Sequence, residues 1–444
     1  MNPGQASSSL KTAHSPRALL IAEAANPEWA SVPLVGWSLA RAIGRATPAH
    51  VVTQVRNRDA FLRAGLREGS DFTAIDTERI LAPLWQLATK LRGGSTRAWT
   101  VQTALTSLAY PLFERAVWQQ FKSRIADHEF DVVHRITPLT PTAPSPLSRW
   151  CSRANVPFVL GPLNGGVPWP EGFDAERRGE REWLSYVRSA YKLLPGYRST
   201  LTHAAAIMAG SRHTLNALPE SVRGKCFYVP ENAVDPERFF RRSGPYRTGP
   251  LRACFVGRLV PYKGPDMLVE AAAPMLAAGH LTLDIVGDGP LMTELKDMVH
   301  RLHLDAAVRL HGWVDHRRVQ DLLCEANVLT FPSIREFGGG VVLEAMALGV
   351  VPIVVDYAGP SELVDDAVGY KIPLGSREQI VLGLRNTLQR LIADPQDLSR
   401  LSEQCVARVR TQFTWEAKAK QIMQVYDWVL GRRASRPDLV SDGA

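Results

Sequence analysis

The C-terminal half of this 444-residue chain alternates short apolar runs with longer amphipathic stretches. The amphipathic stretches are about ten residues or longer, as at Pro265–Ala278 and His316–Asn327. This alternation is typical of a parallel sheet with helices on both faces. The predicted strands are Leu251–Val256, Leu281–Val286, Val308–His311, Val328–Phe331 and Val351–Val355.

The N-terminal half carries a similar pattern with larger helical insertions. A helix is expected at Val35–Arg45, and residues 80–125 are expected to be mostly helical, with a break at Gly93–Ser95. A chain of this length exceeds the usual size of one domain. We therefore expect an α/β fold with two Rossmann-like, doubly wound parallel-sheet domains that face each other across a cleft. The N-terminal strands are expected at Ala18–Ile21, His50–Val55, Val132–His134, Phe158–Gly161 and Ala206–Ala209.

The expected domain limits follow from these elements. The N-terminal domain is assigned to residues 17–235 and the C-terminal domain to residues 236–413. Helices over Arg377–Ala393 and Leu398–Arg410 should close the second domain, and a last helix should run over residues 414–430. The ends of the chain, residues 1–16 and 431–444, are polar and are interpreted as loose tails.

A run of glycines lies between two glutamates, Glu336 and Glu344, which are eight positions apart. The glycines allow positive φ and close approach of a ligand, and a short helix is predicted over Val341–Leu348. The first amides of that helix suit a phosphate, while Glu344 suits the two neighbouring hydroxyls of a ribose and Glu336 a second polyol. A nucleotide-sugar would satisfy these features, but a solvated glutamate pair around a flexible loop also explains them. The loop consists of Gly338, Gly339 and Gly340.

Two cations follow the first predicted strand of the C-terminal half. Arg258 and Lys263 belong to the segment GRLVPYKG, which precedes a helix. Open α/β sheets bind ligands at the carboxyl ends of their strands. Arg offers forked donors to a diphosphate and Lys adds a point charge. A single surface cation has no special meaning, but two cations and two glutamates at one sheet edge favour a diphosphate site.

Four segments together resemble the GT-B retaining glycosyltransferases of family 4, the glycosyl transferases group 1. They are the Gly-Arg-Leu-x-x-x-Lys-Gly and Glu-x7-Glu segments, the turn Val286–Pro290 and the linker Pro230–Asp235, and they occur in the family's order and spacing. The resemblance covers most of residues 251–410 and is looser before them. It implies that the last helix crosses back onto the N-terminal domain.

The resemblance also implies roles for single residues. Arg258 and Lys263 would bind the donor diphosphate, Glu344 the ribose, and Glu336 the transferred sugar. Backbone groups of the glycine-rich turns would hold sugar or phosphate. The residues in this last group are Gly257, Gly338, Gly339, Gly340 and Val341.

The acceptor side of the N-terminal half departs from the family. His134 lies in a segment similar to the one in which a histidine lies near the sugar, but many members have that histidine two residues later, where this chain has Ile136. Either His134 or Arg135 takes over, or acceptor recognition differs; a lone histidine at a strand end is more often structural. The loop after Phe158–Gly161 is a second candidate, as a substrate loop or as a plain turn. Its candidate residues are Asn164, Gly165 and Gly166.

The first predicted strand–helix turn is also unusual. Many family members have a pair of glycines there for phosphate, whereas this chain has NPEWASVP, with Gly36 further on. Donor contacts from this domain would then come from Ser31 or from other amides.

The formal net charge of +8 bears on the partners. Anionic membrane ranks first, anionic substrates second and nucleic acid last, because the sequence has no nucleic-acid motif. The stretch Arg177–Arg198 combines basic residues with aromatics at helical spacing and suits a lipid interface. A helix packed on its own domain explains the same pattern, and we favour it.

Cysteine usage and hydropathy indicate the compartment. The five cysteines are scattered without metal-ligand spacing and are interpreted as mostly buried free thiols of a reducing cytoplasm. No apolar run is long enough to span a bilayer, and Met1–Pro16 lacks the apolar core of a secretory signal. We expect a cytoplasmic protein without metal or cofactor; a peripheral position at the inner face of the cell membrane stays open.

Chemistry and resemblance together predict a nucleotide-sugar-dependent hexosyltransferase. Its acceptor would be a hydroxyl of a glycan or lipid-linked sugar, in cell-surface polysaccharide or glycolipid synthesis. Cations and helix amides would stabilise the leaving diphosphate without a divalent metal. The family implies retention at the anomeric carbon, and no carboxylate is a convincing nucleophile for double displacement, so same-face substitution fits better. Domain closure would exclude water.

Three alternatives stay open. One is a GT-B-like protein that binds nucleotide-sugar without turnover, which Ile136 would suit. A disaccharide phosphorylase of the same fold would require phosphate as a substrate. A dinucleotide-dependent oxidoreductase shares the strand–turn pattern, but the sequence lacks a Gly-x-Gly-x-x-Gly turn with a ribose-binding acid downstream.

Overall fold

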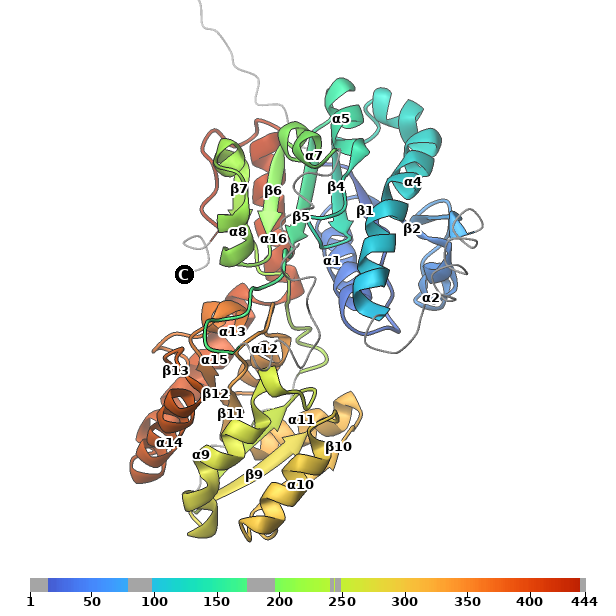
Figure 1. The fold of residues 1–444 in the computed structure, drawn as a ribbon. Helices are drawn as coiled ribbons and strands as arrows, with labels where there is room; N and C mark the ends of the chain where they lie inside the picture. The colour runs from blue at the N-terminus through green and yellow to red at the C-terminus, as the bar shows by residue number, and fades with distance from the viewer. Residues whose placement is uncertain (1–14, 79–97, 174–195, 240–242, 244–248, 440–444) are drawn as a thin grey trace, which may run out of the picture.

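The computed structural model describes residues 15–78, 98–173, 196–239, 243 and 249–439. These residues form two α/β domains, one above the other in Figure 1, and each domain is built on one sheet. Every pairing between named strands is parallel. The expected α/β class with two doubly wound sheets is therefore confirmed.

The N-terminal domain has a sheet in the order β3-β2-β1-β4-β5-β6-β7. Its strands are β1 (Ala18–Ala22), β2 (Ala49–Gln54), β3 (Phe72–Ile75), β4 (Val132–Thr137), β5 (Phe158–Leu163), β6 (Ala206–Ala209) and β7 (Cys226–Tyr228). Its helices are α1 (Val32–Ala46), α2 (Arg58–Arg63), α4 (Ala98–Ala126), α5 (Pro146–Arg153), α7 (Tyr197–His203) and α8 (Arg212–Ala217), with the 3-10 turns η1 (Val55–Asn57) and η4 (Glu220–Lys225).

The C-terminal domain has a sheet in the order β10-β9-β8-β11-β12-β13. Its strands are β8 (Leu251–Val256), β9 (Leu281–Val286), β10 (Val308–Gly312), β11 (Val328–Phe331), β12 (Val351–Val355) and β13 (Tyr370–Ile372). Its helices are α9 (Pro265–Ala277), α10 (Met292–Arg301), α11 (His316–Glu325), α12 (Gly340–Ala347), α13 (Ala358–Leu363), α14 (Arg377–Ala393) and α15 (Gln396–Gln412), with the 3-10 turn η5 (Pro261–Lys263).

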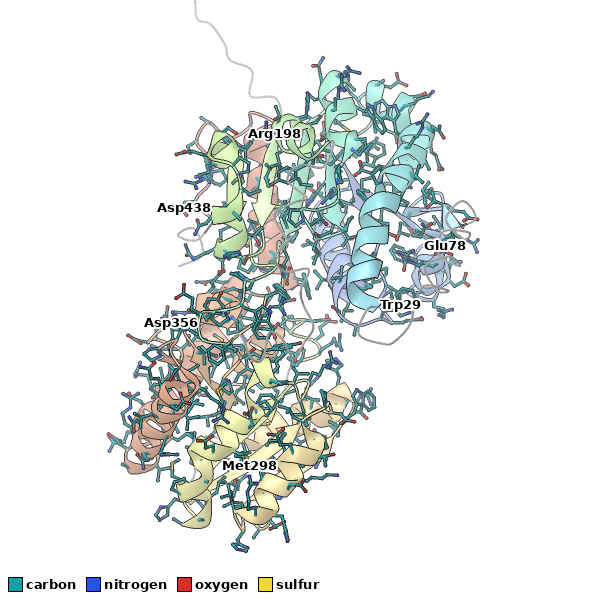
Figure 2. All side chains as sticks on the ribbon, in the orientation of Figure 1. Trp29, Glu78, Arg198, Met298, Asp356 and Asp438 are labelled. Carbon is teal, nitrogen blue, oxygen red and sulfur yellow. The ribbon has the colours of Figure 1, made fainter. Side chains whose placement is uncertain are left out.

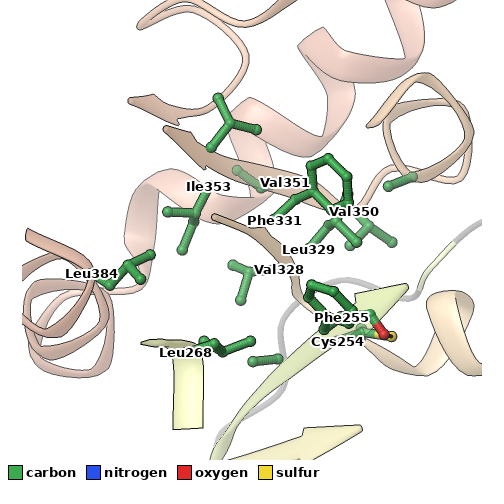
Figure 3. Close-up of a cluster of buried hydrophobic side chains, with 14 of the residues drawn as sticks. Cys254, Phe255, Leu268, Val328, Leu329, Phe331, Val350, Val351, Ile353 and Leu384 are labelled. Atoms are coloured by element: carbon green, nitrogen blue, oxygen red, sulfur yellow. Dashed lines mark hydrogen bonds between the residues drawn. The ribbon is translucent and has the colours of Figure 1, made fainter. Parts of the chain in front are cut away.

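The central strands of both sheets are largely buried because helices cover both of their faces. Figure 3 shows the core around β8, β11 and β12, where the rings of Phe255 and Phe331 stack with centroids 6.1 Å apart. Leu268 of α9 and Leu384 of α14 pack into the same cluster. Each such side chain contributes roughly 1.5–3 kcal/mol to the free energy of folding by leaving water. This core fixes the strand ends that carry the site.

The chain crosses between the domains twice, and the two crossings lie side by side. After β7 it passes through Val234, and after α15 it returns through Phe413 and Thr414. The Val234 amide donates to the Phe413 carbonyl at 2.8 Å, and Val234 forms a β-bridge with Thr414. The last helix, α16 (Trp415–Val429), then packs against α1 on the N-terminal sheet, where Ile422 is fully buried (Figure 1).

The predicted strands and helices agree best with the observed ones where the apolar pattern of the sequence is strongest. Four predicted strands of the C-terminal half coincide with β8, β9, β11 and β12, and Ser211 caps α8 by accepting from the Thr214 amide as expected. The sequence analysis did not predict β3, β7 and β13. Each of these strands has only three or four residues and lies at an edge of its sheet.

The expectation of a loose tail after residue 430 is wrong as far as residue 439. Leu439 is buried against the N-terminal domain, and its carbonyl accepts from Gln421 at 3.3 Å. The Arg436 guanidinium lies 4.7 Å from the ring centroid of Phe227. Apolar burial and a cation–π contact therefore hold a segment whose composition is polar. The interrupted helix at Gly93–Ser95 and most of the stretch Arg177–Arg198 lie outside the described residues.

Candidate functional site at the carboxyl edges of the two sheets

The strand order of the C-terminal sheet brings two predicted loops together. The chain runs from β8 outward to β9 and β10 and then returns to β11 on the other side of β8. This reversal places the loops after β8 and β11 beside each other, which is where open α/β sheets bind ligands. The loop after β8 carries Arg258 and Lys263, and the loop after β11 carries Glu336.

Lys263 and Glu336 are in direct contact. The Lys263 ammonium, in η5, donates to a carboxylate oxygen of Glu336, and it lies 4.9 Å from the ring centroid of Phe331. The other Glu336 oxygen accepts from the Phe337 amide at 3.3 Å. The two loops are also tied through the backbone, because the Ile334 amide donates to the Tyr262 carbonyl at 2.9 Å. Two residues predicted to contact donor phosphate and donor sugar are thus neighbours.

Arg258 lies on the same edge and is exposed, so its guanidinium is open to a ligand. Gly257, predicted to bind the donor, lies directly before it. Its amide donates to the Val286 carbonyl at 2.9 Å and completes the sheet. A side chain at Gly287 would lie 1.9 Å from the Gly257 carbonyl oxygen, so the loop after β9 packs directly on this turn. A Cβ on Gly257 would itself lie 3.6 Å from the rings of Phe255 and Phe331. Contact of Gly257 with a ligand stays a prediction.

The glycine run forms the start of α12, one residue earlier than predicted. Gly339 is the N-cap at φ 57°, a left-handed conformation that suits glycine. A Cβ on Gly338 would lie 2.1 Å from the side-chain nitrogen of Asn232, so no larger residue fits there without movement. The first amides of α12, from Gly340 and Val341, have no acceptor within the helix and form the positive end of its dipole.

Glu344 lies one turn into α12 and is half-buried. Burial raises the pKa of its carboxyl to about 7, while the nearby positive charge of Arg238 opposes that shift. Arg238 comes from the linker between the domains. Its charge favours the ionised form of Glu344, which is the form that accepts hydrogen bonds from two hydroxyls.

The loop after β5 reaches from the N-terminal domain onto the donor-side loops. The Asn164 side-chain amide donates to Glu231 of the linker at 2.7 Å, and its carbonyl oxygen accepts from the Gly166 amide at 3.0 Å. The Gly165 amide donates to the Thr214 hydroxyl at 2.9 Å. Further along the loop, Trp169 packs edge-on against Tyr262, with ring centroids 5.8 Å apart. The segment is therefore an interdomain contact, and much of its polarity is used inside the protein.

Other contacts show that the carboxyl edges of both sheets face each other. Tyr357, after β12, donates to the Pro168 carbonyl at 3.1 Å. The Glu362 carboxylate of α13 accepts a hydrogen bond of 2.9 Å from the backbone amide of Arg212, at the start of α8. In Figure 2 Trp29, which follows β1, lies at the edge of the N-terminal domain turned toward the other domain. Loops from both sheets thus meet at one junction.

His134 has a buried position with hydrogen-bond partners inside the protein. Its ring is fully buried in β4, with Nδ1 2.7 Å from the Tyr426 hydroxyl and Nε2 2.7 Å from the Gly161 carbonyl oxygen. Burial lowers the pKa of His134 to about 4, so the ring is neutral near pH 7. Arg135 is likewise buried and donates to the Ala143 carbonyl at 2.7 Å, and Ile136 lies in the core.

The first strand–helix turn is shaped by side chains instead of a glycine pair. Ser31 adopts φ 63° at the N-cap of α1 and is exposed. Asn26 is buried, and its side-chain oxygen accepts from the Glu28 amide at 2.9 Å. A Cβ on Gly36 would lie 2.2 Å from the Ala24 carbonyl oxygen, so this glycine lets α1 pack against the turn. A donor contact by Ser31 stays a prediction.

Sequence reasoning overlooked three charged residues near the site, namely Arg238, Glu231 and Lys418. Glu231 belongs to a segment interpreted only as a linker, and Lys418 is one of many basic residues on an amphipathic helix. Their burial or proximity depends on how the crossings meet, which no local pattern encodes. Within the described part of the chain, no group of three or more His, Cys, Asp or Glu is placed to hold a metal ion.

Comparison with protein families finds a match for most of the C-terminal domain. Residues 236–405 match the family described as glycosyl transferases group 1. A glycogen synthase of Mycobacterium tuberculosis is 30% identical over 200 residues, which cover 45% of this chain and 47% of the relative. A putative colanic acid biosynthesis glycosyltransferase, WcaL of Salmonella typhimurium, is 26% identical over 295 residues, which cover 60% of this chain and 68% of the relative. The chain thus spans about half the length of the glycogen synthase that it matches.

Comparison with solved structures confirms the GT-B fold. The crystal structure of Anabaena HepE in complex with UDP superposes with a TM-score of 0.61 at 17% identity, covering 93% of this chain and all of the other. Identity at this level shows the fold alone. Among the helices that the structure describes, none is both long and apolar enough to cross a bilayer.

Proposed function

We propose that this chain, whose C-terminal domain matches the glycosyl transferases group 1 and whose fold is GT-B, transfers a sugar from a nucleotide-sugar to a hydroxyl of a glycan or lipid-linked acceptor. One observation carries the proposal. The topological switch point of the C-terminal sheet brings Arg258, the Lys263–Glu336 pair and the start of α12 to one edge. These are the groups that a leaving nucleoside diphosphate and a sugar require.

The donor would lie across this edge with its phosphates on the cations. Arg258 and Lys263 would balance the charge that develops on the diphosphate as the bond to C1 breaks, and the first amides of α12 would add donors. Glu344 would accept from the ribose hydroxyls. Glu336 would hold the Lys263 ammonium in place and accept from hydroxyls of the transferred sugar. Interactions of this kind act on charge in the transition state, so they contribute to turnover more than to ground-state binding.

The finer features of the reaction follow from the same groups. Two cations and a helix end supply the charge stabilisation that a divalent metal supplies elsewhere, so we propose a metal-independent reaction. Retention by same-face substitution is proposed because it requires cations near the leaving group and no carboxylate nucleophile. The similarity to a putative colanic acid biosynthesis enzyme favours a cell-surface polysaccharide product. The basic charge of the chain favours peripheral contact with an anionic membrane.

The first experiment is a thermal-shift panel of nucleotide-sugars on wild type and Glu344→Ala. A ligand at 100 times its dissociation constant raises the free energy of unfolding by about 2.7 kcal/mol. We expect one nucleotide-sugar to stabilise wild type and to stabilise the variant much less. A matched control is Glu294→Ala, an exposed glutamate on α10 that lies away from the predicted site residues in the sequence.

The donor found in this way is then incubated with acceptor extracts, and nucleoside diphosphate release and the anomeric configuration of the product are followed by NMR. Release that survives chelation with EDTA and a product with the donor's configuration support the full proposal. Tight binding without release would favour a nucleotide-sugar-binding protein without turnover. Release that depends on inorganic phosphate would favour a phosphorylase.

A further inference from the structure

The two crossings between the domains carry a pair of buried charges. Glu231 lies three residues before Val234, and Lys418 lies one turn after Thr414, so the pair flanks the β-bridge that joins the crossings. Glu231 is 8% exposed and Lys418 is 1% exposed. Any change in the angle between the domains must act on the chain at these crossings. Glu231 and Lys418 therefore lie at the crossings, where the chain would bend if the two domains changed their relative orientation.

Glu231 fills the space between three loops that follow strand ends. Its carboxylate accepts from the Asn164 side chain at 2.7 Å, on the acceptor-side loop after β5. A Cβ on Gly338, on the donor-side loop, would lie 2.7 Å from the other carboxylate oxygen. A Cβ on Gly210, after β6, would lie 3.1 Å from the Glu231 Cβ. Both glycines thus leave room for this one side chain.

Lys418 is the second buried charge at the crossings, and no hydrogen bond in the described part of the chain accounts for the burial of its ammonium. Its ammonium has no hydrogen-bond acceptor among the described residues, and it lies 5.7 Å from the centroid of the Phe413 ring. A buried ammonium without a counter-charge is costly. The negative charge of Glu231 offsets part of this cost without a hydrogen bond between the two side chains. Glu231 itself accepts from the Asn164 side-chain amide.

We propose that Glu231 is a positioning residue for the transfer reaction, holding the acceptor-side Asn164 loop and the donor-side Gly338 loop in one arrangement, with Lys418 as its counter-charge at the domain crossings. The role in sugar transfer rests on the proposed function. The contacts of Glu231 with the Asn164 loop and the Gly338 loop, together the Glu231 clamp, do not depend on which reaction the protein catalyses.

The clamp should respond to pH near neutrality. Burial raises the pKa of Glu231 to about 7, an effect that Asn164 and Lys418 oppose and Glu336 strengthens. Burial lowers the pKa of Lys418 to about 7, and Glu231 opposes that shift. Protonation of Glu231 removes the negative charge that strengthens the hydrogen bond from Asn164, so that bond becomes weaker. The two loops should therefore be held less firmly as the pH falls through 7.

The charge pairing is tested by thermal unfolding of Glu231→Gln, Lys418→Met and the double variant between pH 5.5 and 9. Glu231→Gln leaves the ammonium unpaired, so its melting temperature should be lowest below pH 7 and recover as the pH rises and the ammonium loses its proton. Lys418→Met leaves the carboxylate unpaired, so its melting temperature should be lowest above pH 7. The double variant should lose less than the sum of the single losses, by several degrees.

The control is Lys420→Met, an exposed lysine of the same helix, which should melt within about one degree of wild type at every pH because surface charges contribute little. Strictly additive losses that do not vary with pH would overturn the charge pairing. This cycle needs no substrate, so its result stands even when no nucleotide-sugar binds and the proposed function fails.

The positioning role is tested on the active enzyme with Glu231→Ala and Glu231→Gln. Glu231→Ala should lower kcat at least tenfold while donor affinity stays within about twofold, since Glu231 does not lie among the donor contacts. Glu231→Gln keeps an acceptor for Asn164 and should recover most of kcat at pH 8, with a flattened decline toward pH 6. An unchanged kcat in Glu231→Ala, or a pH profile that follows wild type in both variants, would overturn the role.

Discussion

The two sheet edges that meet at the domain junction are built in different ways. On the C-terminal sheet, charged residues and glycines recur at the ends of neighbouring strands, and Lys263 and Glu336 are in contact. On the N-terminal sheet, the residues at the corresponding strand ends are used inside the protein, as with His134, which bonds to the Tyr426 hydroxyl and the Gly161 carbonyl. The proposed donor edge therefore carries its polar groups in local sequence motifs, whereas the polar groups of the N-terminal edge are mostly paired within the protein.

This difference shows which kinds of binding site can be recognised from their residues alone. A diphosphate demands cations and free amides, so its site carries a charge signature. An acceptor hydroxyl demands only shape and a few hydrogen bonds. On the N-terminal sheet edge, His134 and Arg135 are buried with internal hydrogen bonds, whereas Gly165 and Gly166 are half-buried and Ser31 is exposed.

The largest expected effect lies on the donor edge. Lys263→Ala should lower turnover by roughly two to three orders of magnitude, the scale for losing one donor to developing oxyanion charge. The measurement is the rate of nucleoside diphosphate release at saturating donor. Lys296→Ala, an exposed lysine of α10, serves as the control and should keep wild-type turnover. If the turnover of Lys263→Ala fell by less than tenfold, the C-terminal sheet edge would not be the site of diphosphate stabilisation, and the proposed difference between the two sheet edges would be wrong.

Gly338→Ala should come next, because the new Cβ meets the Asn232 side-chain nitrogen at 2.1 Å and displaces the turn before α12. Overpacking of this kind costs about 1–3 kcal/mol. We expect a melting temperature lower by several degrees and nucleotide-sugar affinity lower by about tenfold, measured by calorimetric titration. Gly44→Ala, with nothing within 4 Å of its Cβ in helix α1, should melt at or above wild type. Equal behaviour of the two variants would count against a tightly packed donor turn.

The pH dependence of donor binding should show a moderate effect through Glu344. Its raised pKa of about 7 means that the carboxylate, which accepts from ribose hydroxyls, is lost as the pH falls through 7. Affinity for a nucleotide-sugar should therefore fall between pH 8 and pH 6, by at most about tenfold per pH unit for one proton. The dependence should flatten in Glu344→Gln. A slope that persists in that variant would place the titrating group elsewhere.

The smallest effect on activity is expected at His134. His134→Gln should keep kcat within about twofold of wild type, because the ring lies in the core and not at a substrate. Its signature is in stability: the folded pKa of about 4 lies below the ordinary 6.5, so wild type loses stability as the pH falls from 6.5 toward 4. The variant's melting temperature should decline less over that range. A large loss of kcat at unchanged melting temperature would return His134 to the acceptor site.

The contrast also explains what the sequence could predict. Strands β8 and β11 are mostly buried and consist mainly of apolar residues, so their ends were predicted to the residue, and with them the positions of Arg258 and Glu336. The edge strand β13 has three residues and little apolar pattern. Glu231 and Lys418 lie 187 positions apart in the sequence (231 and 418), and only the pairing of the two crossings brings them to one junction.

The orientation of buried polar groups was likewise beyond local patterns. His134 ends one predicted strand and Asn164 follows another, and no local pattern distinguishes which of the two side chains points into the core. The structure shows that the partners, Tyr426 and Glu231, come from distant parts of the chain. Residue type predicts that such groups need partners, while tertiary packing decides which partners they find.

The most direct measurement is a crystal structure of the protein with the nucleotide-sugar selected by the thermal-shift panel. The account predicts the diphosphate at the carboxyl ends of β8 and β11, within about 3 Å of the Arg258 and Lys263 side chains, with the ribose hydroxyls on Glu344. Density for the nucleotide at the N-terminal sheet, or a diphosphate away from both cations, would contradict the central claim that the donor binds at this edge.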